Sequence, residues 1–92
     1  MNWHDYETEN ENNQKIFVVL DPDQQGHLLV TLANYHTFII NQWEIGEIEN
    51  AEIIYVCYLL GNIEGRLLCN HVTQRDLDII EDWELEILNA SR

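Results

Sequence analysis

The sequence predicts an α+β fold, a small antiparallel sheet of four to five strands followed by an acidic C-terminal helix. Three observations favour this fold. β-branched and aromatic residues fill several short apolar runs, as is typical of strands. Gly, Pro, Asn and Asp residues separate these runs at turn-like intervals. A helix-capping signal at Thr73 opens a last segment whose apolar residues have helical spacing.

The predicted sheet is organised around a β-hairpin in the middle of the chain. Its first arm, residues 51–60, ends in eight consecutive apolar residues, so we expect it to be central in the sheet and covered on both faces. Residues 61–65 form a connection with a glycine at each end, and residues 66–72 form the second arm. Symmetric closure of this hairpin places Cys57 opposite Cys69. We therefore expect these two cysteines to be cross-strand neighbours with free thiols, their Cα atoms within about 6 Å.

Earlier segments supply further strands. Residues 15–20 are predicted to be a short buried strand, followed by a turn at residues 21–26 and a second strand at residues 28–32. After a turn at residues 34–36, a third strand is expected at residues 37–45. The first hairpin and this strand complete the predicted sheet.

A helix is the alternative for part of this region. The apolar residues of 28–43 also have helical spacing, and Asp21 and Pro22 are suited to the N-cap and first position of a helix. Against a helix stand Gly26 and several β-branched residues, which lose rotamer freedom there. We favour the strands and leave the helix open.

The last predicted element is a helix over residues 73–82. The hydroxyl of Thr73 can cap its first turn, and Asp76, three residues later, can return the bond and favours the positive end of the helix. Residues 83–87 alternate between apolar and acidic side chains as a strand would, so the continuation of the helix stays open.

The composition predicts one folded domain over residues 1–92. At 46% hydrophobic residues the chain is too apolar to be disordered, except for a polar, acidic segment at residues 1–14 that we expect to be flexible. No apolar stretch approaches the roughly 20 residues needed to cross a bilayer, and no signal sequence is evident. We therefore expect a cytoplasmic protein that is not attached to a membrane.

Charge is the strongest functional signal. Seventeen acidic residues against four basic ones give a net charge of −13, which disfavours direct binding to nucleic acid or to an anionic membrane. We expect the partner to be a basic protein, such as a nucleic-acid-binding protein or a nuclease, and leave a homodimer open. The candidate partner-binding residues are the carboxylates of two clusters: Glu44, Glu47, Glu49, Glu52, Asp76, Asp78, Glu81, Asp82, Glu84 and Glu86.

Motifs for metal binding and catalysis are incomplete. Asp21, Asp23, Gln25 and Gly26 resemble the start of a calcium loop, but Leu32 stands where the loop requires a bidentate Glu. The histidines and cysteines lack zinc-site spacing, and no nucleophile or phosphate-binding motif occurs. We expect no metal site, no cofactor and no enzymatic activity.

In size, charge and lack of a catalytic motif the chain resembles small acidic phage inhibitors that mimic DNA, namely anti-restriction and anti-CRISPR proteins. The resemblance implies an inhibitor that blocks the basic nucleic-acid-binding cleft of a target, such as a host-defence nuclease or another DNA-binding protein. One alternative is an immunity protein or antitoxin that neutralises a basic nuclease toxin. Another is a protein-interaction subunit that binds through an exposed edge strand.

Overall fold

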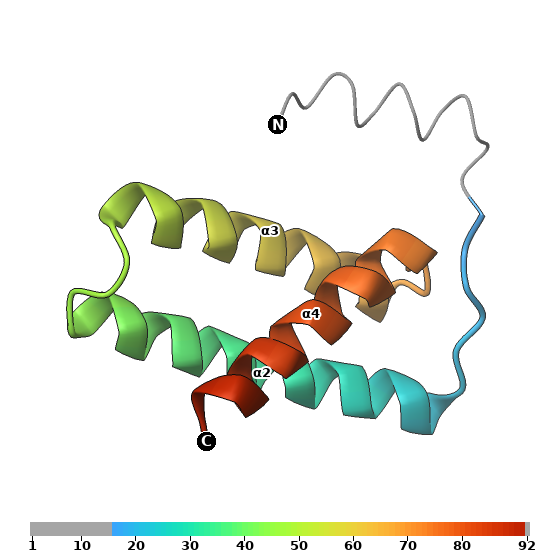
Figure 1. Cartoon of the computed structure of the whole chain (residues 1–92). Coiled ribbons are helices and arrows are strands. Elements are labelled where there is room, and N and C mark those ends of the chain that lie inside the picture. Colours follow the sequence, from blue (N-terminus) through green and yellow to red (C-terminus); the bar gives the residue numbers. More distant parts are fainter. Residues whose placement is uncertain (1–15, 92) are drawn as a thin grey trace.

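The computed structural model describes residues 16–91, and these residues form three helices (Figure 1). The helices are α2 (Pro22–Glu44), α3 (Asn50–Leu68) and α4 (Gln74–Ala90). α2 and α3 run side by side in opposite directions, and α4 lies across them (Figure 1). The described part contains no sheet, so the predicted α+β fold is wrong and the observed fold is all-α. The segment 1–14 that we expect to be flexible lies outside the described residues.

The three helices share one apolar core. Each helix contributes side chains spaced three or four residues apart, which places them on one side of that helix. The buried apolar residues are Leu32, Tyr35, Ile39, Leu60, Ile63, Leu67, Val72, Ile80 and Trp83. The ring of Tyr35 on α2 stacks on that of Trp83 on α4, with centroids 4.6 Å apart. The core therefore depends on helical spacing in all three elements.

α2 replaces the strands predicted at residues 28–32 and 37–45. It begins with a capping box, in which Asp21 accepts a hydrogen bond from the backbone N–H of Gln24 at 2.8 Å, and the Gln24 side chain accepts one from the N–H of Asp21 at 3.0 Å. Pro22 occupies the first turn, where its missing N–H costs nothing. The helix left open by the sequence is thus the correct structure. Burial of its apolar stripe outweighs the weaker helix propensity of its β-branched residues.

α3 replaces the predicted central hairpin. One continuous helix runs through the expected first arm, residues 51–60, and on through both glycines of the expected connection at residues 61–65. Each interior glycine costs a helix up to about 1 kcal/mol, a loss that burial of Leu60, Ile63 and Leu67 offsets. The pattern of β-branched and aromatic residues reflects one buried side of a helix rather than a strand covered on both faces.

The cysteines are consequently not cross-strand neighbours. Cys57 lies within α3 and Cys69, twelve positions later, is its C-cap residue, so about 18 Å of axial rise separates them. Both are free cysteines. The prediction of close Cα atoms is wrong because it depended on the hairpin.

Both interhelical loops begin with the same chain reversal, the Schellman motif. After α2, Gly46 adopts a left-handed conformation (φ 83°), and the N–H groups of Gly46 and Glu47 donate to the carbonyl oxygens of Trp43 and Gln42 at 3.1 and 2.9 Å. After α3, Asn70 (φ 60°) occupies the equivalent left-handed position. These reversals set the antiparallel course of α2 and α3 and return the chain toward α4.

The segment before α2 is extended but does not form the buried strand predicted at residues 15–20. Phe17 makes an isolated antiparallel bridge to Thr73, and the N–H of Val18 donates to the carbonyl oxygen of Val72 at 2.7 Å. Val19 is 94% exposed and Ile16 77%, and only Leu20 of the described part of this run packs against the core, as a partly buried side chain. The segment packs along the α3–α4 loop because its backbone groups find partners there.

Candidate functional site

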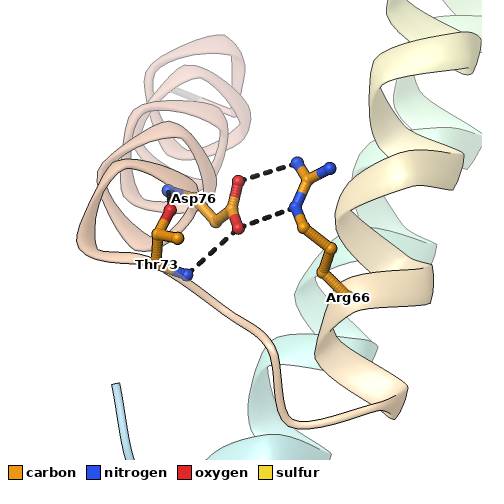
Figure 2. A network of polar contacts seen from close by, with 3 residues as sticks. All are labelled: Arg66, Thr73 and Asp76. Atoms are coloured by element: carbon orange, nitrogen blue, oxygen red, sulfur yellow. Dashed lines mark hydrogen bonds and ion pairs between the residues drawn. The ribbon is translucent and has the colours of Figure 1, made fainter. Parts of the chain in front are cut away.

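The start of α4 is held by a buried ion pair. Asp76 is fully buried and accepts hydrogen bonds from Nε and Nη2 of Arg66 on α3, at 2.9 and 2.8 Å (Figure 2). It also accepts one from the backbone N–H of Thr73 at 3.2 Å, while the Thr73 hydroxyl accepts from the N–H of Asp76 (Figure 2). The predicted cap at Thr73 is confirmed. Asp76, one of the ten candidate carboxylates, faces α3 and is not accessible to a partner.

The other acidic residues of α4 lie toward solvent. Asp78, Glu81, Asp82 and Glu86 are exposed. Asp78 and Asp82 are one turn apart, as are Asp82 and Glu86, so these three form a row along the outside of the helix. The helix continues to Ala90, beyond the predicted residues 73–82, which keeps Glu86 on the same rigid element. α4 therefore presents four accessible carboxylates in a fixed arrangement.

Glu86 is anchored by a tyrosine of α2. The hydroxyl of Tyr35 donates to Oε2 of Glu86 at 2.9 Å. Burial of the phenol, its hydrogen bond to Glu86, and the negative charges of Glu86 and Glu52 all raise the pKa of Tyr35 above its ordinary value. The charges of Glu52 on α3 and Glu86 on α4 both act on this phenol, so one acid of each cluster influences Tyr35.

The second cluster surrounds the α2–α3 loop. Glu44, Glu47, Glu49 and Glu52 are all exposed. Glu49 is the N-cap residue of α3 and Glu52 lies in its first turn, where the positive N-terminal end of the helix favours negative charge. The favourable interaction with the N-terminal end of α3 is therefore enough to account for Glu49 and Glu52 without a binding partner.

A groove between α2 and α4 adds groups that the sequence did not reveal. Its volume is about 570 Å³, its floor includes Leu28, Leu77 and Ile80, and its rim carries His27 and Glu84. Nε2 of His27 lies 3.8 Å from Oε2 of Glu84, and the Glu84 side chain is about half exposed. The groove brings together residues more than fifty positions apart, so no local pattern could have indicated it.

The described residues offer little beyond acids and apolar surface. Among residues 16–91, no group of three His, Cys, Asp or Glu side chains is arranged to hold a metal ion. None of the helices in this range combines the length and the apolar character needed to cross a membrane. Comparisons with known proteins returned no matching family model, no similar curated protein and no similar solved structure.

Proposed function

We propose that this chain is an acidic DNA-mimic inhibitor that blocks the basic nucleic-acid-binding cleft of a target protein, such as a host-defence nuclease or another DNA-binding protein. The observation that carries the proposal is the outer side of α4. Its four accessible carboxylates extend from residue 78 to residue 86, about 12 Å of helix axis, or roughly one charge every 4 Å. One strand of duplex DNA presents a phosphate about every 3.4 Å along its axis.

The surroundings of these carboxylates support an interaction rather than a solvated surface. Between residues 16 and 91 the chain has thirteen acids and two bases, Arg66 and Arg75, and Arg66 is engaged with the buried Asp76. Like charges one turn apart destabilise a helix by a few tenths of a kcal/mol per pair. The row on α4 thus reduces stability, and a basic cleft would relieve that cost.

Competition tests this function. The purified chain should displace a fluorescent duplex from a target in a panel of restriction and RNA-guided nucleases, with the two ligands excluding each other. Affinity should fall as salt rises, since exposed charges are screened beyond about 8 Å at 0.15 M. Simultaneous binding of DNA and this chain to the target contradicts mimicry.

Matched charge variants locate the surface. Asp78→Asn with Asp82→Asn should weaken inhibition, whereas Asp23→Asn with Glu64→Gln, which changes the net charge equally but away from the outer side of α4, should have a much smaller effect. Equal effects of the two double variants would indicate that only net charge matters. The row on α4 would then have no specific role.

An immunity protein or antitoxin is the second candidate, and Leu85 favours it. This side chain is 49% exposed and lies on the outer side of α4 among the carboxylates. An apolar group there has no counterpart in a row of phosphates but suits the surface of one cognate toxin. Leu85→Ala should leave a mimic active against its targets and should weaken an immunity protein against its toxin. The described residues contain no sheet and therefore offer no edge strand for the third alternative, a protein-interaction subunit.

A further inference from the structure

The groove between α2 and α4 carries acidic side chains on both of its walls. The two helices cross at the stacked rings of Tyr35 and Trp83, and the groove lies between their N-terminal parts, which diverge from this crossing (Figure 1). Asp23 stands on the α2 wall, and Glu81 and Glu84 stand on the α4 wall. None of the described residues that line the groove is a Lys or an Arg. The groove is therefore bordered by negative charge on two sides.

The floor between these walls is apolar. Leu20, from the segment before α2, lies there beside Leu28, Leu77 and Ile80. Leu20, Leu28 and Leu77 are only partly buried, so each has surface left for a ligand to contact. The volume of about 570 Å³ is in the usual range of ligand-binding pockets, about 300–1,000 Å³. An apolar floor between acidic walls favours a ligand that combines apolar groups with positive charge.

The groove and the row of carboxylates occupy different sides of α4. Glu84 lines the groove, while Asp82 and Glu86 of the row are each two residues away from it, about 160° around the helix axis. Among the four exposed acids of α4, Glu81 is the one that also borders the groove. A ligand in the groove therefore leaves Asp82 and Glu86 accessible, and α4 can take part in two separate interactions.

The length of the walls indicates the size of the ligand. α4 lines the groove from Gln74 to Glu84, ten positions, or about 15 Å of helix axis. A peptide of about five residues in extended conformation covers this length at about 3.3 Å per residue. Lys and Arg side chains can lay their aliphatic stems along an apolar floor while their charged ends reach the walls. A short peptide segment can thus engage both walls at once, which a cation with a single charge cannot.

The charges also discriminate among the chains that could enter the groove. Residues 1–14 of this protein contain four acids and no Lys or Arg, and a second copy of the protein brings a net charge of −13. Either occupant would set carboxylates against carboxylates. A segment that carries Lys or Arg is attracted instead, so charge complementarity favours a basic segment of another protein.

We propose that the groove between α2 and α4 binds a short peptide segment of a partner protein in which basic and apolar residues alternate. Basic side chains pair with Asp23 and Glu84 on the opposite walls, and apolar side chains contact Leu28 and Leu77. The Glu84 side chain is about half exposed, so an ion pair there is better shielded from water than one on an open surface. Binding in the groove is independent of what the row on α4 binds.

Titration of the ¹⁵N-labelled full chain with the peptide acetyl-Arg-Leu-Ala-Leu-Arg-amide tests the site. Saturable changes in amide chemical shift should centre on residues 20–28 and 74–84. A peptide with Ser in place of both Leu keeps the charge, and one with Gln in place of both Arg keeps the apolar groups. Each should bind about tenfold more weakly or less, because each lacks one of the two features that the groove recognises.

Matched variants of the protein locate the charges that matter. Asp23→Asn with Glu84→Gln removes one carboxylate from each wall and should weaken binding of the Arg-Leu peptide about tenfold. Asp78→Asn with Asp82→Asn changes the net charge equally and should alter the affinity less than about twofold at 0.15 M salt. Circular dichroism checks that both variants keep their helices. Because the control pair is the one expected to weaken inhibition of a DNA-binding target, the two proposals fail separately.

Four results would overturn the proposal. The first is a peptide titration without saturation, or with shift changes centred outside the groove. The second is equal binding of the Ser peptide, which would indicate attraction to net charge alone. The third is equal binding of the Gln peptide, which would indicate a purely apolar site. The fourth is a groove variant that binds the Arg-Leu peptide as tightly as the wild type does.

Discussion

Asp76 is the residue whose role changes most between sequence and structure. In the sequence it belongs to an acidic run with Asp78 and Glu81, and the charge pattern predicts a partner-binding role for all three. In the fold it is fully buried, and its oxygens are engaged by Arg66 and by the N–H of Thr73. A buried carboxylate is tolerated when its partners replace water, and the bidentate guanidinium does so. Its burial depends on a residue ten positions earlier on another helix, which no local pattern indicates.

Removing either partner of this ion pair should destabilise the fold, but unequally. Arg66→Met leaves a fully buried carboxylate without its cation, at a cost of about 3–5 kcal/mol. Asp76→Asn leaves an arginine whose side chain is 34% exposed and can be hydrated, at a cost of about 1.5–3 kcal/mol. Urea unfolding measures both, with Asp78→Asn as the control expected within about 0.5 kcal/mol of wild type. Equal losses from the two variants would contradict this account.

Tyr35 should make stability sensitive to alkaline pH. Its raised pKa means that the folded state holds the phenol proton more tightly than the unfolded state does. The resulting stabilisation is complete below the ordinary tyrosine pKa of about 10 and is lost as pH rises above it. Denaturant unfolding across this range should therefore show a smaller alkaline loss in Tyr35→Phe than in wild type. Glu86→Gln, which keeps an acceptor but removes one charge, should be intermediate.

At the scale of the elements, capping signals were more informative than residue preferences. The Thr73 cap correctly marks the start of α4, and Asp21 with Pro22 marks the start of α2, the helix that the sequence left as the alternative. α3 has no side-chain cap hydrogen bond at its N-terminus, and its interior carries β-branched residues and two glycines. α3 is helical because its apolar side is buried against α2. This is a tertiary interaction, which the helix or strand propensities of its residues do not indicate.

The same substitution at two glycines should have opposite effects. Gly46→Ala forces a side chain into the left-handed conformation that ends α2 and should lower the free energy of unfolding by about 1–2 kcal/mol. Gly61→Ala adds a methyl group in open space within a helix and should raise it by about 0.5–1 kcal/mol. Thermal unfolding measures both. A loss at position 61 would indicate that its backbone is not helical.

At the scale of the molecule, the described charges are separated into regions. Acids gather on α4 and around the α2–α3 loop, while long stretches of α2 and α3 carry none. The sequence revealed the two acidic clusters and nine carboxylates that are indeed at least partly exposed. It did not reveal that Glu52 and Glu86, one acid from each cluster, both act on Tyr35, since this depends on how the helices pack.

Salt should stabilise the free protein. Repulsion among the accessible acids opposes folding, and NaCl screens it, so the melting temperature should rise as salt increases from low ionic strength. Neutralising Asp78, Glu81, Asp82 and Glu86 together should raise stability by a few tenths of a kcal/mol per relieved pair and reduce this salt dependence. The Asp23→Asn, Glu64→Gln variant should change the stability and its salt dependence less than the fourfold variant does. A melting temperature that falls with salt would show that the charges are stabilising in the native state.

α4 carries six of the thirteen acids of the described residues and lies on one side of the α2–α3 pair (Figure 1), which gives the described molecule a permanent electric dipole across the helix layers. In the field of a basic surface such a body is turned before contact, so that most encounters begin with α4 leading and the less acidic α2 and α3 trailing. Productive collisions then form a larger fraction of all collisions, and the association rate exceeds that of a molecule with the same net charge spread evenly. The arrangement of charge, and not only its amount, therefore sets how fast this protein finds a cationic partner.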